Sequence, residues 1–176
     1  MSALRRLVMG VIALIERLSA AMAWLSGAIF MVLAIYITLD TLGRSFGGPY
    51  SGFTDDISAF ALATAGTWAT AHALQVGAHV RVDLLLPLLP PALRAGLDQL
   101  TIILAGLFAA LLAYHAWMLA AGSYRLGARS ISVLQAPLVI PQGLLAFGLT
   151  MLALQAAALL IERWLNGSQP EADAGS

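Results

Sequence analysis

Apolar residues dominate four long runs of the chain, at residues 18–39, 57–76, 100–121 and 138–161. Each run is long enough for a helix that crosses a bilayer, which takes about 20 residues. None alternates between apolar and polar positions, as the strands of a membrane barrel do over segments of about ten residues. Because unpaired backbone groups are too costly in hydrocarbon, the pattern predicts an all-α membrane protein with four transmembrane helices.

Shorter patterns divide the chain further. Residues 1–17 repeat apolar side chains at helical spacing and carry charges on the other side, which predicts an amphipathic lead-in along the membrane surface. A single helix over residues 7–39 would be about 50 Å long, and a bilayer core is about 30 Å thick, so we expect the lead-in to be separate from the first span. The predicted domains are the lead-in at 1–17, a transmembrane domain at 18–165 with spans at about 18–42, 55–76, 98–122 and 138–162, and a disordered tail at 166–176.

Arginine placement predicts the orientation of the four spans. All nine basic residues are arginines, and only Arg44, Arg125 and Arg129 fall on the side away from the chain ends. The other six fall on the side of the ends, so the positive-inside rule favours cytoplasmic N- and C-termini.

Composition excludes several functions. Only 10% of the residues are charged, where a soluble domain has about 25%. The formal net charge is zero and no basic patch occurs, so nucleic acid is not an expected partner. The absence of cysteine excludes thiol catalysis and cysteine-ligated metal. No HExxH motif occurs either, and no Ser/His/Asp set can be assembled at one depth, so we expect no enzyme, no catalytic residues and no metal site.

Apart from acidic residues at the span boundaries, the ionisable side chains within the predicted spans are few: Asp40, His72 and His115. An ion-coupled carrier usually needs such groups near the middle of the bilayer, so a stand-alone transporter fits poorly. The two histidines raise the alternative of a haem-carrying electron-transfer protein. By helical rise, however, their depths differ by roughly 20 Å, and two ligands of one iron must lie at one depth. We therefore expect no cofactor, and interpret both histidines as packing residues.

The second predicted span carries a row of small residues that lets another helix approach closely. The row consists of Ala61, Ala65, Ala69 and Ala73. It could pack within the chain's own bundle, or it could form a seam for a partner subunit.

Polar residues at the span ends are further candidates. Asp40 and Arg44 are four residues apart and can pair on a helix surface. After the glycine-rich turn, Thr54 or Asp55 can cap the second span, and Asp55 with Asp56 places acidic charge at a helix N-terminus.

The densest polar cluster is His79, Arg81 and Asp83, just after the second span. Arg81 can bind lipid phosphate or a partner's carboxylate, and the leucine- and proline-rich residues that follow predict a short interfacial segment before the third span. The alternative is that the cluster only fixes the topology and caps a turn.

These residues carry a resemblance to a known family. The stretch "HVRVDLLLPLLPPALR" is similar to the signature after the second span of the small integral-membrane subunit of tripartite ATP-independent periplasmic (TRAP) transporters, the DctQ-type subunit. The stretch "SVLQAPLVIPQGLLAFG" resembles that family's entry to its last span, and the resemblance covers roughly residues 18–164. Asp55 and Asp56 stand where the family usually has glutamates.

The resemblance implies a function that the residue patterns alone do not give. It implies a small scaffold subunit, without a transport site of its own, in the inner membrane of a bacterial cell. Its implied partners are membrane lipid, a large multi-span permease subunit and a periplasmic solute-binding protein, and the implied process is ion-gradient-driven uptake of organic acids such as C4-dicarboxylates. The alternative is a small membrane anchor of another complex, such as an electron-transfer assembly.

Overall fold

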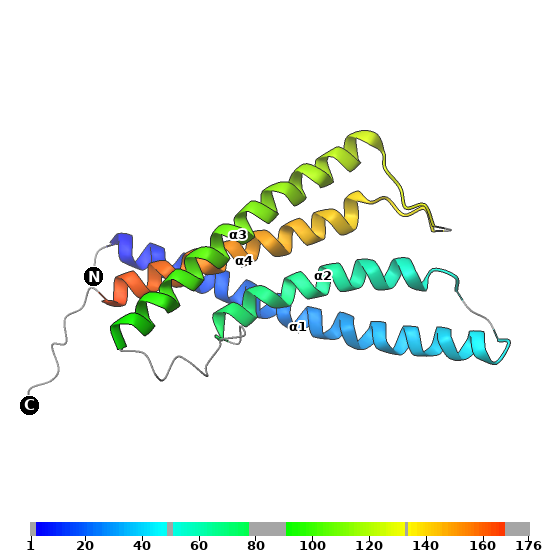
Figure 1. Cartoon of the computed structure of the whole chain (residues 1–176), viewed down its shortest axis with the longest axis horizontal. Coiled ribbons are helices and arrows are strands. Elements are labelled where there is room, and N and C mark those ends of the chain that lie inside the picture. Colours follow the sequence, from blue (N-terminus) through cyan, green and yellow to red (C-terminus); the bar gives the residue numbers. More distant parts are fainter. Residues whose placement is uncertain (1–2, 49–50, 78–90, 133, 168–176) are drawn as a thin grey trace, which may run out of the picture.

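The computed structural model describes residues 3–48, 51–77, 91–132 and 134–167. These residues form four α-helices, α1 (Ala3–Ser45), α2 (Thr54–Gln75), α3 (Pro91–Leu126) and α4 (Val139–Gly167). Successive helices run in opposite directions, so α1 starts and α4 ends at the same end of the bundle (Figure 1). Within the described residues, the only β-pairing is an isolated bridge in the α3–α4 connection. The prediction of an all-α fold is confirmed.

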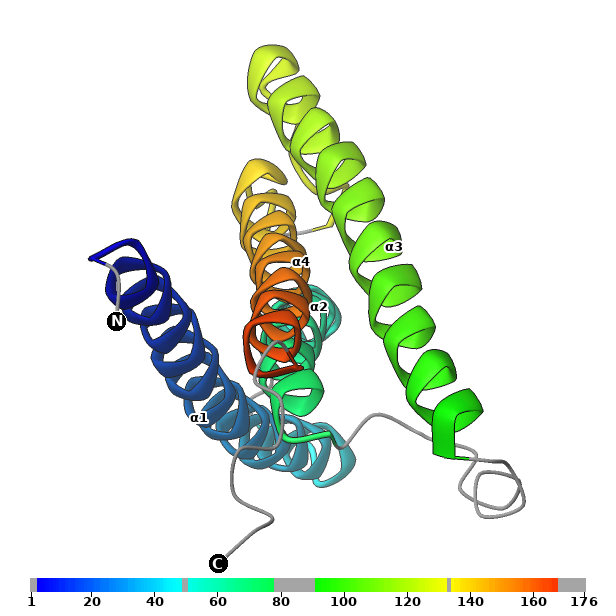
Figure 2. The same ribbon diagram turned by 90° about the vertical axis from the view of Figure 1, so that its left-hand side faces the viewer.

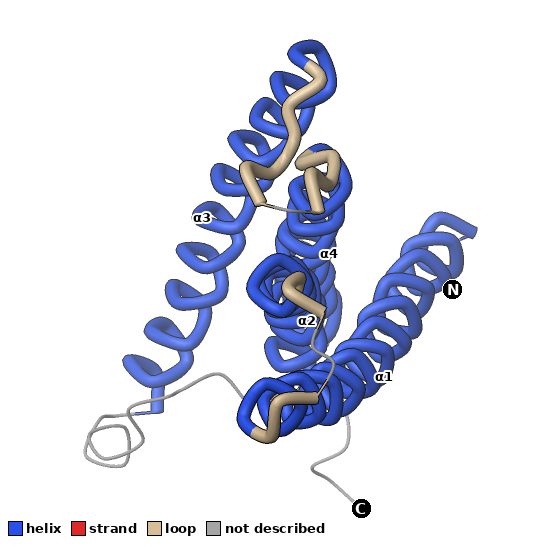
Figure 3. Tube along the Cα trace, turned by 90° about the vertical axis from the view of Figure 1, so that its right-hand side faces the viewer, coloured by secondary structure: helices blue, strands red, loops and turns tan. Residues whose placement is uncertain are grey.

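The helices form a layered arrangement with two of them in the middle. Helices α2 and α4 lie side by side, with α1 on one flank and α3 on the other (Figures 2 and 3). Helix α1 packs mainly on α2 and to a lesser extent on α4, and α3 packs on α4. The outer sides of α1 and α3 therefore form the two broad flanks of the bundle.

Three of the described helices, α1, α3 and α4, are long and apolar enough to cross a membrane. Helix α2 has 22 residues, enough in length to span a bilayer core, but its threonines and His72 make it less apolar than the others. A helix enclosed by neighbours meets protein rather than lipid over much of its surface, so it needs fewer apolar side chains. The crossing by α2 stays a prediction.

Helix α1 differs from the expected division at residue 17. It runs without interruption for 43 residues, which is about 65 Å of helix. The charged pair Glu16 and Arg17 does not end it, because both are good helix formers and no proline occurs within it. The lead-in and the first span are thus one helix, whereas the position of residues 1–17 along the membrane surface stays a prediction.

Helix α3 starts at Pro91, as proline favours. Gly127 ends α3 with a positive φ of 58°, and the next N–H, of Ala128, donates to the carbonyl of Ser123 at 2.9 Å. The capping prediction for α2 is wrong. The residue before the helix is Phe53, no side chain caps it, and the Thr54 hydroxyl donates to Asp40 instead. The predicted interfacial segment and tail lie outside the described residues.

The bundle interior consists largely of small side chains. Fully buried alanines occur on both central helices, at Ala65, Ala71, Ala146 and Ala156. They allow close approach between helices, which is how helices associate in membranes, where burial of apolar surface offers no net drive. Large apolar side chains lie instead on the outside, mostly on α1 and α3.

Candidate functional site

The small-residue row of α2 contributes one member to the interior. Ala65 is fully buried, and its carbonyl oxygen accepts a hydrogen bond from the Ser26 hydroxyl of α1. Ala61, Ala69 and Ala73 are only half-buried. The chain's own bundle therefore uses Ala65, and the idea that the remaining row forms a seam for a partner subunit stays a prediction.

A close helix contact lies between α2 and α4 at Gly148. A Cβ atom added to Gly148 would lie 2.6 Å from Thr67 Oγ1 and 2.7 Å from Trp68 Cδ1. Trp68 also donates its indole N–H to the carbonyl oxygen of Leu144 at 3.0 Å and meets Phe147 edge-on at a centroid distance of 6.0 Å. Only glycine at position 148 permits this contact, which fixes the two central helices against each other.

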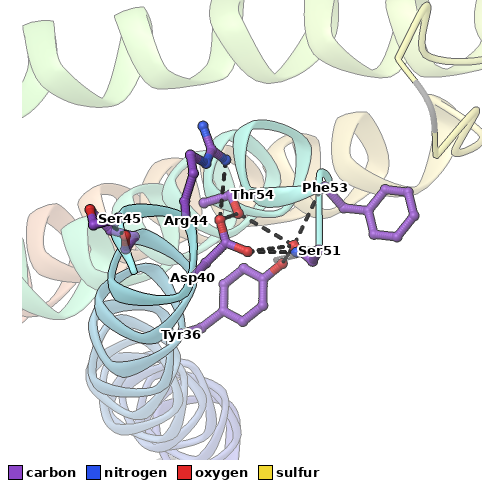
Figure 4. Close-up of polar contacts among 8 residues, drawn as sticks. Tyr36, Asp40, Arg44, Ser45, Ser51, Phe53 and Thr54 are labelled. Carbon is purple, nitrogen blue, oxygen red and sulfur yellow. Dashed lines mark hydrogen bonds and ion pairs between the residues drawn. The ribbon is translucent and has the colours of Figure 1, made fainter. Parts of the chain in front are cut away.

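A polar cluster around Asp40 closes the α1–α2 end of the bundle (Figure 4). The Oδ1 atom of Asp40 accepts hydrogen bonds from the backbone N–H of Ser51 at 2.7 Å and from the Ser51 hydroxyl at 3.1 Å. Its Oδ2 atom accepts from Thr54 Oγ1 at 2.7 Å and from Arg44 Nη2 at 3.2 Å. The predicted Asp40–Arg44 pair is thus confirmed, but it is one part of a larger Asp40 cluster.

The two partners in that ion pair are not equally exposed. The Asp40 side chain is 4% exposed and that of Arg44 is 61% exposed. Tyr36 of α1 extends the cluster through its hydroxyl contact with Ser51 (Figure 4). With four donors from its own chain, the Asp40 carboxylate ties α1 to the start of α2, and it has little capacity left to bind a substrate.

The acidic pair Asp55 and Asp56 separates into two different environments. Asp55 is exposed, whereas Asp56 is half-buried and accepts hydrogen bonds from the hydroxyls of Ser130, at 3.2 Å, and Ser132. The two serines contact each other at 2.9 Å. Asp56 therefore ties the start of α2 to the α3–α4 connection, at the same end of the bundle as the Asp40 cluster.

A buried polar contact joins α1 to α4 in the half of the bundle away from the Asp40 cluster. Ser19 donates to Gln155 Oε1 at 2.9 Å, and both side chains are fully buried. Met22, Ala71 and Met151 form an apolar cluster of buried residues from α1, α2 and α4. The Nε2 atom of Gln155 has no hydrogen-bond partner among the described residues.

The two membrane histidines lie closer in depth than expected. Trp117 of α3 donates to Thr150 of α4 at 3.1 Å, and nearby Gly148 abuts Thr67 of α2. Gly106 of α3 abuts Ala156 of α4, so nine residues further along α3, His115 lies level with residue 147 of the antiparallel α4. His115 therefore lies near the level of Thr67, which is five residues, or about 8 Å of helical rise, from His72. The expected difference of roughly 20 Å in depth was therefore too large.

The physical reason lies in the position of α3, which begins beyond the end of α2. Leu74, one residue before the end of α2, clusters with Ile102, eleven residues into α3. His72 is on α2, with Nδ1 3.0 Å from Gln75 Oε1, while His115 is exposed on α3. Across the described part of the chain, no group of three metal-ligating side chains forms.

Three of the predicted site residues, His79, Arg81 and Asp83, lie outside the described residues, so their roles stay predictions. Sequence reasoning missed Ser51, Ser130 and Ser132 as partners of the two aspartates. In the sequence, these serines were marked only by their positions in the α1–α2 and α3–α4 connections. Gly148 was noticed only as part of a motif, since a glycine in a sequence does not reveal which helix approaches it.

Comparison with known proteins identifies the family. A family model described as "Tripartite ATP-independent periplasmic transporters, DctQ component" matches residues 32–166, well over half of the chain. The chain belongs to this family. Neither curated proteins nor solved structures gave a match. The suspected relationship to the small TRAP subunit is confirmed.

The family assignment connects the observed contacts to a transport system. The DctQ component is the small membrane component of TRAP transporters, which also contain a large permease and a solute-binding protein. The matched region includes the Asp40 and Asp56 ties and the Gly148 contact. In this DctQ component, the central pair of helices is closely packed and two aspartates tie segments together at one end of the bundle.

Proposed function

We propose that this DctQ component is a stationary scaffold for the large permease subunit and carries no solute itself. The observation that carries this proposal is the bundle interior. It is occupied by alanines and by polar groups bonded within the chain, such as Ser19 with Gln155 and Ser26 with Ala65. A solute path would require ionisable or polar groups that face a shared cavity near mid-membrane.

The outer surface supports the same proposal. Large apolar side chains are exposed along α1 and α3 on the two flanks of the bundle, for example Met31 and Ile35 on α1 and Leu107 and Phe108 on α3. Apolar surface of this extent must be covered by lipid or by other membrane helices. A rigid bundle with broad apolar flanks can both anchor in lipid and add to the wall of a larger subunit.

The proposal includes a location and an orientation. The chain lies in the bacterial inner membrane with both termini in the cytoplasm, so the Asp40 cluster and Asp56 face the periplasm. The periplasmic solute-binding protein docks on that side. An ion gradient drives the uptake of organic acids such as C4-dicarboxylates by the whole system. On the cytoplasmic side, His79, Arg81 and Asp83 hold lipid phosphate or the large subunit.

Affinity purification with a tag on this chain tests the scaffold role. The large permease subunit should co-purify in mild detergent from cells that express both, and deletion of this chain should abolish uptake while the large subunit remains in the membrane. If the large subunit supports full uptake without this chain, the scaffold role is wrong.

A further inference from the structure

His115 is placed unusually for a side chain on a membrane helix. It is exposed on α3, and no described residue makes a hydrogen bond to its ring. Its neighbour Tyr114 is also exposed, and the two rings meet edge-on at a centroid distance of 5.5 Å. A neutral imidazole carries one donor and one acceptor, so at least two hydrogen-bonding positions on this surface lack a partner among the described residues.

The depth of His115 prevents water from supplying those partners. It lies near the level of Thr67, which is 13 residues from the start of α2 and eight from its end, or about 20 and 12 Å by helical rise. A histidine side chain is too short to reach the membrane surface from there, unlike the long side chains that extend to the interface. Ionisable groups inside a membrane almost always face protein or an aqueous cavity.

The residues around His115 form a stripe along the outer side of α3. Their spacing alternates between four and three residues, which places them on one side of a helix and is typical of a seam with another helix. We call them the His115 stripe: Leu104, Phe108, Leu111, His115 and Met118, all of them exposed. Helix α3 lies on the opposite side of the central α2–α4 pair from α1 (Figure 3).

Between Trp24 and Thr38, the exposed side of α1 offers no equivalent group. Its exposed Thr38 hydroxyl donates to the Ala34 carbonyl at 2.7 Å, so this group is satisfied within the helix. Trp24 presents a single N–H on a large apolar ring. Lipid can therefore cover α1 at low cost, whereas the His115 stripe requires a protein neighbour.

We propose that the His115 stripe binds a transmembrane helix of the large permease subunit, and that this helix presents a hydrogen-bonding side chain to His115. The proposal rests on the proposed scaffold function, and it names the surface by which the two subunits meet. The occupant is a membrane helix rather than lipid tails, because hydrocarbon provides neither a donor nor an acceptor.

Photo-crosslinking in cells that express both subunits tests the surface directly. A photoreactive amino acid replaces Leu111 or Met118 on the stripe, and Val32 or Ile35 on the exposed side of α1 serves as the matched control. Illumination should give a covalent adduct with the large subunit from the two α3 positions and not from the α1 positions.

Two variants test the hydrogen bond itself. His115→Leu should reduce the large subunit retained on the tagged chain by roughly three- to ten-fold after a detergent wash, as loss of an interhelical hydrogen bond in a membrane predicts. His115→Gln keeps a donor and an acceptor and should restore retention. The leucine variant is more apolar, so it should still insert, and its unfolding temperature in detergent checks that it folds.

The outcomes separate the two proposals. If the large subunit co-purifies but the adducts come from α1, contain a second copy of this chain, or contain only lipid, the interface is wrong and the scaffold function stands. Retention that is unchanged in His115→Leu also overturns the interface. If the wild-type chain retains no large subunit at all, the scaffold function itself is wrong.

Discussion

Replacement of Gly148 by alanine should separate the two central helices. The added Cβ would lie 2.6 Å from Thr67 Oγ1, 2.7 Å from Trp68 Cδ1 and 2.9 Å from Thr67 Cβ. Unstrained nonbonded heavy atoms lie about 3.5–4.0 Å apart, so relief of this overlap requires a shift of about 1 Å. Trp68 is held by its bond to Leu144, which limits how far it can move.

The magnitude follows from a comparison with a matched control. Overpacking of this kind costs about 1–3 kcal/mol. Gly143 lies on the same helix, and a Cβ there would meet nothing within 4 Å. Both substitutions gain helix propensity, up to about 1 kcal/mol, so this gain largely cancels in the difference between them. Gly148→Ala should therefore be less stable than Gly143→Ala by about 1–3 kcal/mol.

Thermal unfolding of the purified variants in one detergent provides the assay. At roughly 2–4 °C per kcal/mol for a chain of this size, Gly148→Ala should unfold roughly 2–12 °C below Gly143→Ala. Gly106→Ala should lie between them, since its Cβ would meet a single atom, Ala156 Cβ, at 2.9 Å. Equal unfolding temperatures for Gly148→Ala and Gly143→Ala would refute the close α2–α4 contact.

Three further predictions concern polar groups. Asp40→Asn removes the carboxylate oxygen that accepts from Thr54 and Arg44, so limited proteolysis should cut the α1–α2 turn faster than in wild type. An unchanged cleavage rate would contradict the role of Asp40 in holding α1 to the start of α2. Ser19→Ala should lower the free energy of unfolding by about 1–3 kcal/mol because it leaves the buried Gln155 side chain without a partner. Unfolding in detergent measures this loss, and an unchanged stability would show that the Ser19–Gln155 bond does not stabilise the fold. Arg81→Ala should lower co-purified large subunit and uptake, and wild-type values for both would show that it has no role in assembly.

The broad architecture could be predicted from hydrophobicity alone. Four apolar runs required four helices, and glycines and prolines marked where most of them end. The continuity of α1 through residue 17 was missed because a helix longer than the bilayer core was expected to be divided. Helix formation depends on backbone hydrogen bonds, which Glu16 and Arg17 do not interrupt.

Contacts between helices were harder to predict because they depend on helix rotation and inclination. The row at Ala61, Ala65, Ala69 and Ala73 follows sequence spacing, yet only Ala65 is fully buried. Neighbours on two sides, α1 and α4, decide which positions of α2 are covered. No spacing rule could show that Gly148 would meet Thr67.

Most hydrogen bonds of the polar clusters could not be predicted from sequence spacing either. The Asp40–Arg44 pair is local and could be predicted from a spacing of four residues. The bonds from Ser51 and Thr54 to Asp40, and from Ser130 to Asp56, join segments 11 to 74 residues apart in sequence. Thr54 or Asp55 was expected to cap α2, but neither side chain does so, and the Thr54 hydroxyl donates to the buried carboxylate of Asp40 instead.

Solute uptake by reconstituted liposomes tests the scaffold function most directly. The purified chain alone, the large permease subunit alone, and the two together are each placed in liposomes with the binding protein, a radiolabelled C4-dicarboxylate and a sodium gradient. The scaffold account predicts accumulation only when both membrane subunits are present. Accumulation by liposomes that contain this chain without the large subunit would contradict it.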